Sequence, residues 1–123
     1  IMGRKTYQEN NHALPGRLNI VITSDEQLRL PPGVLSVRSL AEALDAAQRS
    51  GRQAFVLGGS GLFREAFALA DEVYESVVMA NFEGDTFIDA FDFSEWRTEK
   101  LGAHDADALH AVGFVMYRHS RDL

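Results

Sequence analysis

The sequence contains no cysteine, so neither disulfide bonds nor thiolate metal ligands can contribute to its stability or chemistry. It has no apolar run near the length of about 20 residues that crosses a bilayer. Basic residues are in the minority, with 12 Lys and Arg against 18 Asp and Glu and a net charge of −6. Because nucleic acids are polyanions, this balance argues against a nucleic-acid partner. The composition is that of a globular protein compatible with the cytoplasm.

Grouped catalytic side chains are also scarce. The four histidines show no spacing typical of metal ligands on one helix. His104 and His110, with Asp105 and Asp107 nearby, come closest to such a group. No Ser-His-Asp arrangement can be assembled from the sequence. We therefore expect neither a metal site nor a hydrolase triad.

The first 70 residues alternate between strand and helix patterns. Short β-branched runs predict strands at 19–23 and 34–37. A helix is predicted from Ser39, with Glu42 completing a capping box, and it should end at Gly51. The continuously apolar run 54–57 predicts a strand buried on both faces of a parallel sheet. Residues 58–61 then turn into a second helix.

The remainder is richer in strands. Strands are predicted at 73–82, 96–101 and 113–119, with a turn at Gly84-Asp85-Thr86. The last two strands should form a hairpin around a polar loop at 104–110. At 123 residues, without repeats or linkers, residues 1–123 fit a single domain. The predicted class is α/β, a mainly parallel central sheet flanked by helices with an antiparallel C-terminal edge hairpin.

The segment FVLGGSGLF, residues 55–63, is the strongest local signal for ligand binding. An apolar strand runs through two glycines directly into a helix, so backbone without Cβ could approach a ligand and helix amides could attract an anion. The glycines could equally serve only the dihedral angles of a tight turn. The segment lacks the complete dinucleotide fingerprint.

Hydroxyl and basic side chains follow the predicted strands. In open α/β sheets the carboxyl ends of the strands meet at one rim, where ligands bind. Such a rim would suit a phosphate, although unrelated solvated charges would give the same pattern. Arg17 follows the rigid turn Pro15-Gly16 and could grip a carboxylate with two hydrogen bonds. The rim residues are Arg4, Lys5, Thr6, Thr23, Ser24 and Arg38.

Taken together, IMGRKTY at the start, LPGR followed by NIVITS, FVLGGSGLF, and EGDTF at 83–87 resemble the dihydrofolate reductase family. Their order and spacing fit this family over essentially the whole chain. The resemblance implies reduction of 7,8-dihydrofolate to tetrahydrofolate by NADPH, with hydride transfer to pterin C6 and a proton to N5. The reductase domain of riboflavin biosynthesis is similar in fold, and a non-catalytic nucleotide-binding module is the alternative of another class.

The resemblance also implies roles for particular residues. Arg17 would hold the glutamate tail of the substrate, Leu57 would offer its carbonyl to the pterin, Phe63 would lie near the nicotinamide, and Ser76 would support the pterin pocket. Asp85 would steady the mobile active-site loop. The residues implied at the cofactor are Arg4, Lys5, Thr6, Thr23, Ser24, Arg38, Gly58, Gly59, Ser60, Gly61 and Leu62.

The chain departs from the family pattern in three ways. Phe63 stands where a tyrosine is common, and Glu9-Asn10-Asn11 replaces a less polar stretch on the substrate side. The resemblance also places the family's first strand, mobile loop and catalytic carboxylate before Ile1. No catalytic residue is therefore expected in residues 1–123. We expect these residues alone to be inactive, with the N-terminal segment as a complementing piece.

Overall fold

The computed structural model describes residues 1–10, 13–25, 28–78, 91–105 and 113–121. The chain divides into two compact units, Ile1–Ala68 and Leu69–Leu123. In the described ranges, no helix is long and apolar enough to cross a membrane.

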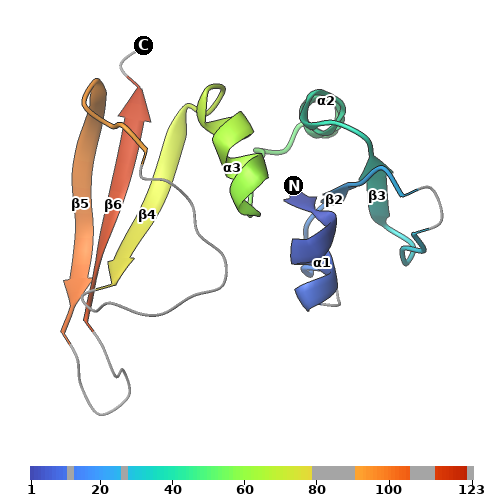
Figure 1. Ribbon diagram of the computed structural model, residues 1–123, viewed down its shortest axis with the longest axis horizontal. Helices are drawn as coiled ribbons and strands as arrows, with labels where there is room; N and C mark the ends of the chain where they lie inside the picture. Colours follow the sequence, from blue (N-terminus) through green and yellow to red (C-terminus); the bar gives the residue numbers. More distant parts are fainter. Residues whose placement is uncertain (11–12, 26–27, 79–90, 106–112, 122–123) are drawn as a thin grey trace. The chain divides into compact units, whose positions relative to one another are not determined.

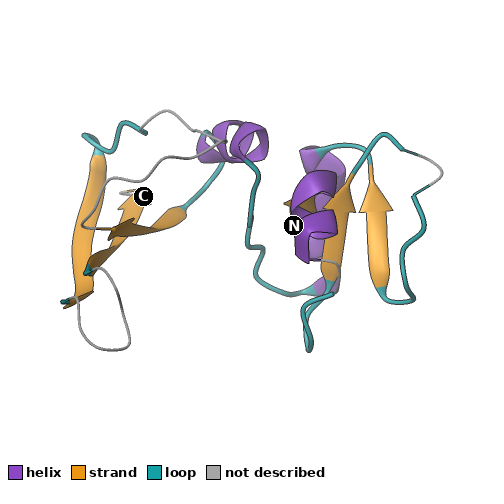
Figure 2. Ribbon diagram, turned by 60° about the horizontal axis from the view of Figure 1, so that its bottom comes forward, coloured by secondary structure: helices purple, strands orange, loops and turns teal. Residues whose placement is uncertain are grey.

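The first unit is built on a parallel sheet with strand order β1-β2-β3 (Figures 1 and 2). Met2 pairs with Val21, and Ile20 pairs with Leu35. This confirms the predicted strands near residues 20 and 35. The elements of the unit are β1 (Met2–Gly3), α1 (Arg4–Asn10), β2 (Asn19–Ile22), β3 (Val34–Val37), α2 (Leu40–Ser50) and α3 (Ser60–Phe67).

The side chains of β2 point alternately to the two faces of this sheet, and each face carries its own hydrophobic core. Ile20 is 1% exposed and packs with Ile1 and with the buried side of α2. Val21 is fully buried on the other face with Met2 and Tyr7. Successive strand residues point to opposite faces, so two neighbouring β-branched residues serve both cores.

The caps of α2 are those predicted from the sequence. Ser39 Oγ accepts a hydrogen bond from the backbone N–H of Glu42 at 3.1 Å. Glu42 Oε2 accepts from the N–H of Arg38, one residue earlier than the usual capping box, at 3.0 Å. Gly51 ends the helix at φ +72°, the left-handed conformation that favours glycine. Local chemistry therefore sets both ends of α2.

Residues 54–57 run beside β1 but are not a regular strand. The Ile1 nitrogen donates to the Phe55 carbonyl at 2.8 Å, and the Leu57 N–H donates to the Ile1 carbonyl at 2.9 Å. The prediction of burial on both faces is wrong here, because Phe55 is 55% exposed and Leu57 46%. Within the described ranges, this segment forms backbone hydrogen bonds on one side only, with the start of the chain at β1. Its other edge has no backbone partner among the described residues, which explains the exposed side chains.

The second unit is an antiparallel sheet with strand order β4-β6-β5. The predicted C-terminal hairpin is confirmed by the antiparallel pairing of β5 with β6, which has a register shift between Lys100 and Gly102. The predicted turn at Gly84-Asp85-Thr86 and the loop around His110 lie outside the described residues. The three strands are β4 (Glu72–Val78), β5 (Trp96–His104) and β6 (Phe114–Arg121).

A buried histidine links the three strands of this unit. His119 on β6 is 5% exposed, and Phe93 stacks on its ring with centroids 3.6 Å apart. Its Nε2 lies 2.9 Å from Glu75 Oε1 on β4, and its Nδ1 lies 2.8 Å from Thr98 Oγ1 on β5. Because a carboxylate only accepts hydrogen bonds, Nε2 is the donor to Glu75.

Thr98→Val is expected to destabilise the protein by about 1–3 kcal/mol, because the buried Nδ1 of His119 loses its partner while the shape is kept. Urea unfolding would measure the difference. An unchanged unfolding midpoint would contradict the view that this hydrogen bond stabilises the sheet.

Candidate functional site

The turn that follows residue 57 packs against the start of the chain. The Gly3 N–H donates to the Gly58 carbonyl at 2.8 Å, and the peptide bond between Gly58 and Gly59 is cis. Gly58 has φ +126°, a conformation that side chains rarely adopt. A Cβ at this position would lie 3.5 Å from the Phe63 ring and 3.6 Å from Thr6 Oγ1. The backbone itself therefore requires glycine at position 58.

Gly59 is different, because its φ of −85° is open to any residue. A Cβ there would lie 3.6 Å from Thr6 Oγ1, an ordinary van der Waals contact. Nothing in the described chain demands glycine at 59. Close approach of a ligand to the backbone would explain why position 59 is a glycine.

The helix that starts after this turn has no side-chain cap. Gly59 is the N-cap residue of α3 and has no side chain to bond the first amides, which belong to Ser60, Gly61 and Leu62. The positive end of the helix dipole lies at the same place. Cβ-free backbone followed by uncapped amides is suited to a phosphate or another anion.

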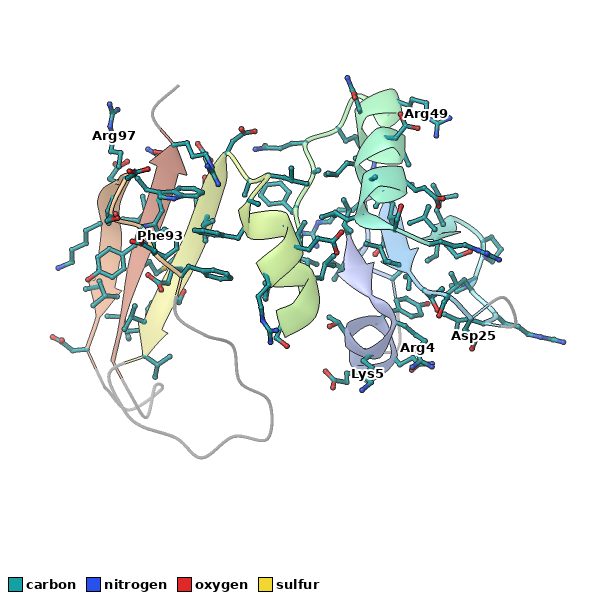
Figure 3. All side chains as sticks on the ribbon, turned by 45° about the horizontal axis from the view of Figure 1, so that its top comes forward. Arg4, Lys5, Asp25, Arg49, Phe93 and Arg97 are labelled. Atoms are coloured by element: carbon teal, nitrogen blue, oxygen red, sulfur yellow. The ribbon has the colours of Figure 1, made fainter. Side chains whose placement is uncertain are left out.

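The carboxyl ends of the parallel strands carry the predicted rim residues. Arg4 and Lys5 are exposed on the first turn of α1, directly after β1 (Figure 3). Thr23 and Ser24 follow β2, and Arg38 follows β3. The sheet therefore brings cations and hydroxyls to one edge, as the sequence predicted; their role as ligands stays a prediction.

Two carboxylates lie close to this rim. The Thr23 N–H donates to the Val37 carbonyl at 2.8 Å, which holds the ends of β2 and β3 side by side. The Asp25 N–H donates to Thr23 Oγ1 at 3.0 Å, so an acidic side chain follows the hydroxyl pair. Glu42 is bonded to the Arg38 backbone. An anion at this edge would need the guanidinium to offset these charges.

Arg17 lies at the opposite end of β2 from Thr23 and lines a separate pocket of about 450 Å³. This volume is in the range of small-molecule sites. Leu57, which directly precedes Gly58, also lines the pocket. The glycine turn therefore begins at the edge of the cavity. The lining is mainly apolar and consists of Ile1, Met2, Leu14, Gly16, Arg17, Leu18, Asn19, Ile20, Ala47, Ser50, Arg52, Gln53, Ala54, Phe55 and Leu57.

Two further residues with predicted roles belong to the part of the chain after Ala68. Ser76 lies on β4 in the second unit, where it is exposed. Asp85 lies outside the described residues.

Sequence reasoning missed four polar residues of the pocket, Asn19, Ser50, Arg52 and Gln53. Asn19 was predicted only as the first residue of a strand, yet it is 3% exposed. An amide directly before the apolar run Ile20-Val21-Ile22 was the available signal, because a buried polar group needs partners.

Comparisons with known proteins agree on one family. The family model described as dihydrofolate reductase matches residues 1–121. A dihydrofolate reductase of Bacillus subtilis strain 168 is 35% identical over 119 residues, which is 95% of this chain and 70% of the relative. A dihydrofolate reductase of Staphylococcus aureus strain Mu50 is 36% identical over 97 residues, covering 79% of this chain and 58% of the relative.

Solved structures give the same result at the level of the fold. A dihydrofolate reductase from Enterococcus faecalis, complexed with NADP(H) and RAB-propyl, has a TM-score of 0.82 and 29% identity. The match covers 99% of this chain and 73% of that one. A Schistosoma mansoni dihydrofolate reductase has a TM-score of 0.77 at 22% identity, covering 98% of this chain and 73% of that one, and supports the fold alone.

Proposed function

Because the chain belongs to the dihydrofolate reductase family, we propose that it takes part in the NADPH-dependent reduction of 7,8-dihydrofolate to 5,6,7,8-tetrahydrofolate in the cytoplasm. The observation that carries this proposal is the glycine turn. Gly58 is left-handed, Gly59 tolerates a Cβ within the chain, and α3 begins without a cap. Such a turn fits a pyrophosphate-bearing cofactor.

The residues of the first unit divide between the two ligands. Backbone at Gly58, Gly59 and the first turn of α3 would hold the cofactor pyrophosphate, with Arg4, Lys5 and Thr6 beside it. Leu57 would accept a hydrogen bond from the pterin through its carbonyl, and Arg17 would pair with the tail carboxylate. Phe63, which is 36% exposed and lies beside Gly58, would shield the nicotinamide from water.

When bound, NADPH supplies the hydride for pterin C6. The chain's own part is to orient the two ligands and to keep the reacting region apolar. Protonation of N5 needs a donor that is not among the residues assigned here.

We also propose that the open edge of residues 54–57 takes up a further apolar strand. Phe55 and Leu57 are about half exposed there, and the pairing with β1 uses only one side of the segment. A strand on the other side would satisfy the remaining backbone groups and cover these side chains. The form of the protein that contains this strand, attached or as a separate peptide, is called the completed protein below.

The completed protein is expected to bind NADPH at least tenfold more tightly than NADH. Thr23, Ser24 and Arg38 offer hydroxyls and a cation to the 2'-phosphate, and a charge-assisted hydrogen bond contributes about 1.5–3 kcal/mol. Fluorescence titration with each cofactor would measure both dissociation constants. Arg38→Gln should weaken NADPH binding by about tenfold and leave NADH binding unchanged.

Arg49→Gln is the matched control, because Arg49 pairs with Asp45 on α2 at 2.7 Å, away from the rim. Its effect on both cofactors should be negligible. Equal affinity of the parent for NADPH and NADH would overturn the assignment of the rim residues.

A further inference from the structure

The side chain of Asn19 is buried beneath the turn that carries Arg17. Its Nδ2 donates to the Leu14 carbonyl at 2.9 Å and to the Arg17 carbonyl at 3.0 Å. Its Oδ1 accepts from the Leu14 N–H at 2.8 Å. Both amide hydrogens and one oxygen lone pair are therefore used on a single turn.

Two residues of this turn add few contacts of their own. Pro15 has no N–H to donate, and Gly16 is left-handed at φ +71°, where a Cβ would meet nothing within 4 Å among the described residues. The main chain of Asn19, by contrast, belongs to β2 and is paired with Val34. The amide thus ties the turn to the sheet.

The hydrogen bond from Asn19 to the Arg17 carbonyl fixes the position of the Arg17 backbone. Asn19 bonds the carbonyl of Arg17 itself, so the backbone of that residue is fixed at the edge of the 450 Å³ pocket. Within the described residues, no carboxylate forms an ion pair with the guanidinium of Arg17. A bidentate contact needs the guanidinium plane in one orientation, so it depends on how well its backbone is held.

We propose that Asn19 is a positioning residue for substrate binding, which acts through Arg17 on the carboxylate of the substrate tail. This inference rests on the proposed function, because it requires a substrate with an anionic tail in the pocket. Asn19 does not touch the reacting atoms. Its loss should therefore change the recognition of the tail and not the rate of hydride transfer.

Asn19→Asp in the completed protein separates this role from a purely structural one. Aspartate keeps the size of the side chain and the acceptor for the Leu14 N–H, but it turns both donated bonds into contacts between acceptors. KM for dihydrofolate should rise about tenfold while kcat is unchanged. KM for a dihydropterin that lacks the tail should not change.

A cycle with Arg17→Ala tests whether the effect passes through Arg17. Once the guanidinium is absent, Asn19→Asp should raise KM for dihydrofolate no further.

Gly16→Ala strains the same turn without filling occupied space, and it should raise KM for dihydrofolate alone. If Asn19→Asp does not fold, Gly16→Ala still tests the inference. Thr98→Val, which weakens the second unit, should leave both KM values unchanged.

The outcomes distinguish the inference from the proposed function. If the parent neither binds nor reduces dihydrofolate, the proposed function is overturned and the inference with it. If the parent is active but Asn19→Asp or Gly16→Ala raises KM for both substrates equally, or lowers kcat, Asn19 is structural only and the inference is overturned. Additive effects with Arg17→Ala would overturn it as well.

Discussion

Gly59→Val is expected to abolish NADPH binding while leaving the fold of the protein intact. The backbone at Gly59 is extended, at φ −85° and ψ −158°, and its φ is negative, as residues with a Cβ prefer. Among the described residues, a Cβ there would meet only Thr6 Oγ1, at 3.6 Å. The branched side chain would instead occupy the space in which a pyrophosphate must approach the amides of α3.

Fluorescence titration with NADPH, together with thermal unfolding of the same samples, would measure both effects. Gly58→Ala is the companion variant, because its φ of +126° makes any side chain strained. It should lower the stability by about 1–3 kcal/mol, whether or not the cofactor is present. A Gly59→Val protein that folds like the parent and binds NADPH normally would show that the glycine pair serves the turn alone.

The second large effect concerns residues 1–123 produced alone, which are expected to be poorly folded and inactive. Among the described residues, one row of backbone groups of the segment 54–57 has no partner, and Phe55 and Leu57 are exposed. Within the described residues, β4 pairs only with β6, so the second unit also has an open edge. A domain is stable by only about 5–15 kcal/mol, so lost pairing and burial of this extent can exceed its stability.

Circular dichroism and amide exchange of residues 1–123, with and without an added apolar strand, would measure the loss and the recovery. We expect cooperative unfolding only when the strand is present. A peptide of the same composition in scrambled order is the matched control and should have no effect. Cooperative unfolding and full turnover by residues 1–123 alone would contradict the proposal of a further strand.

The sequence predicted most of the elements because their signals are local. Ser39, Glu42 and Gly51 define α2 by hydrogen bonds within a few residues, and the run at Asn19–Ile22 is too β-branched to favour a helix. The fold class is confirmed by the parallel and antiparallel sheets and by the structural match to the Enterococcus faecalis enzyme. The expectation of a single domain stays a prediction.

The errors arose where a feature depends on a distant neighbour. The apolar run 54–57 was expected to be buried, but burial depends on a partner along its second edge. The contacts of the Asn19 side chain could not be foreseen, because its partners, Leu14 and Arg17, lie in a turn whose shape the sequence does not specify. The grouping of rim residues was easier to foresee, since parallel strands carry their ends to one edge.

The central claim is that this chain supplies the cofactor site for dihydrofolate reduction, and dihydrofolate-dependent oxidation of NADPH tests it most directly. The absorbance of NADPH would be followed in the completed protein, with and without dihydrofolate, for the parent and for Gly59→Val. We predict oxidation that requires dihydrofolate, occurs in the parent, and disappears in the variant. A completed protein that binds NADPH but never oxidises it when dihydrofolate is added would contradict the account and identify a nucleotide-binding module without catalysis.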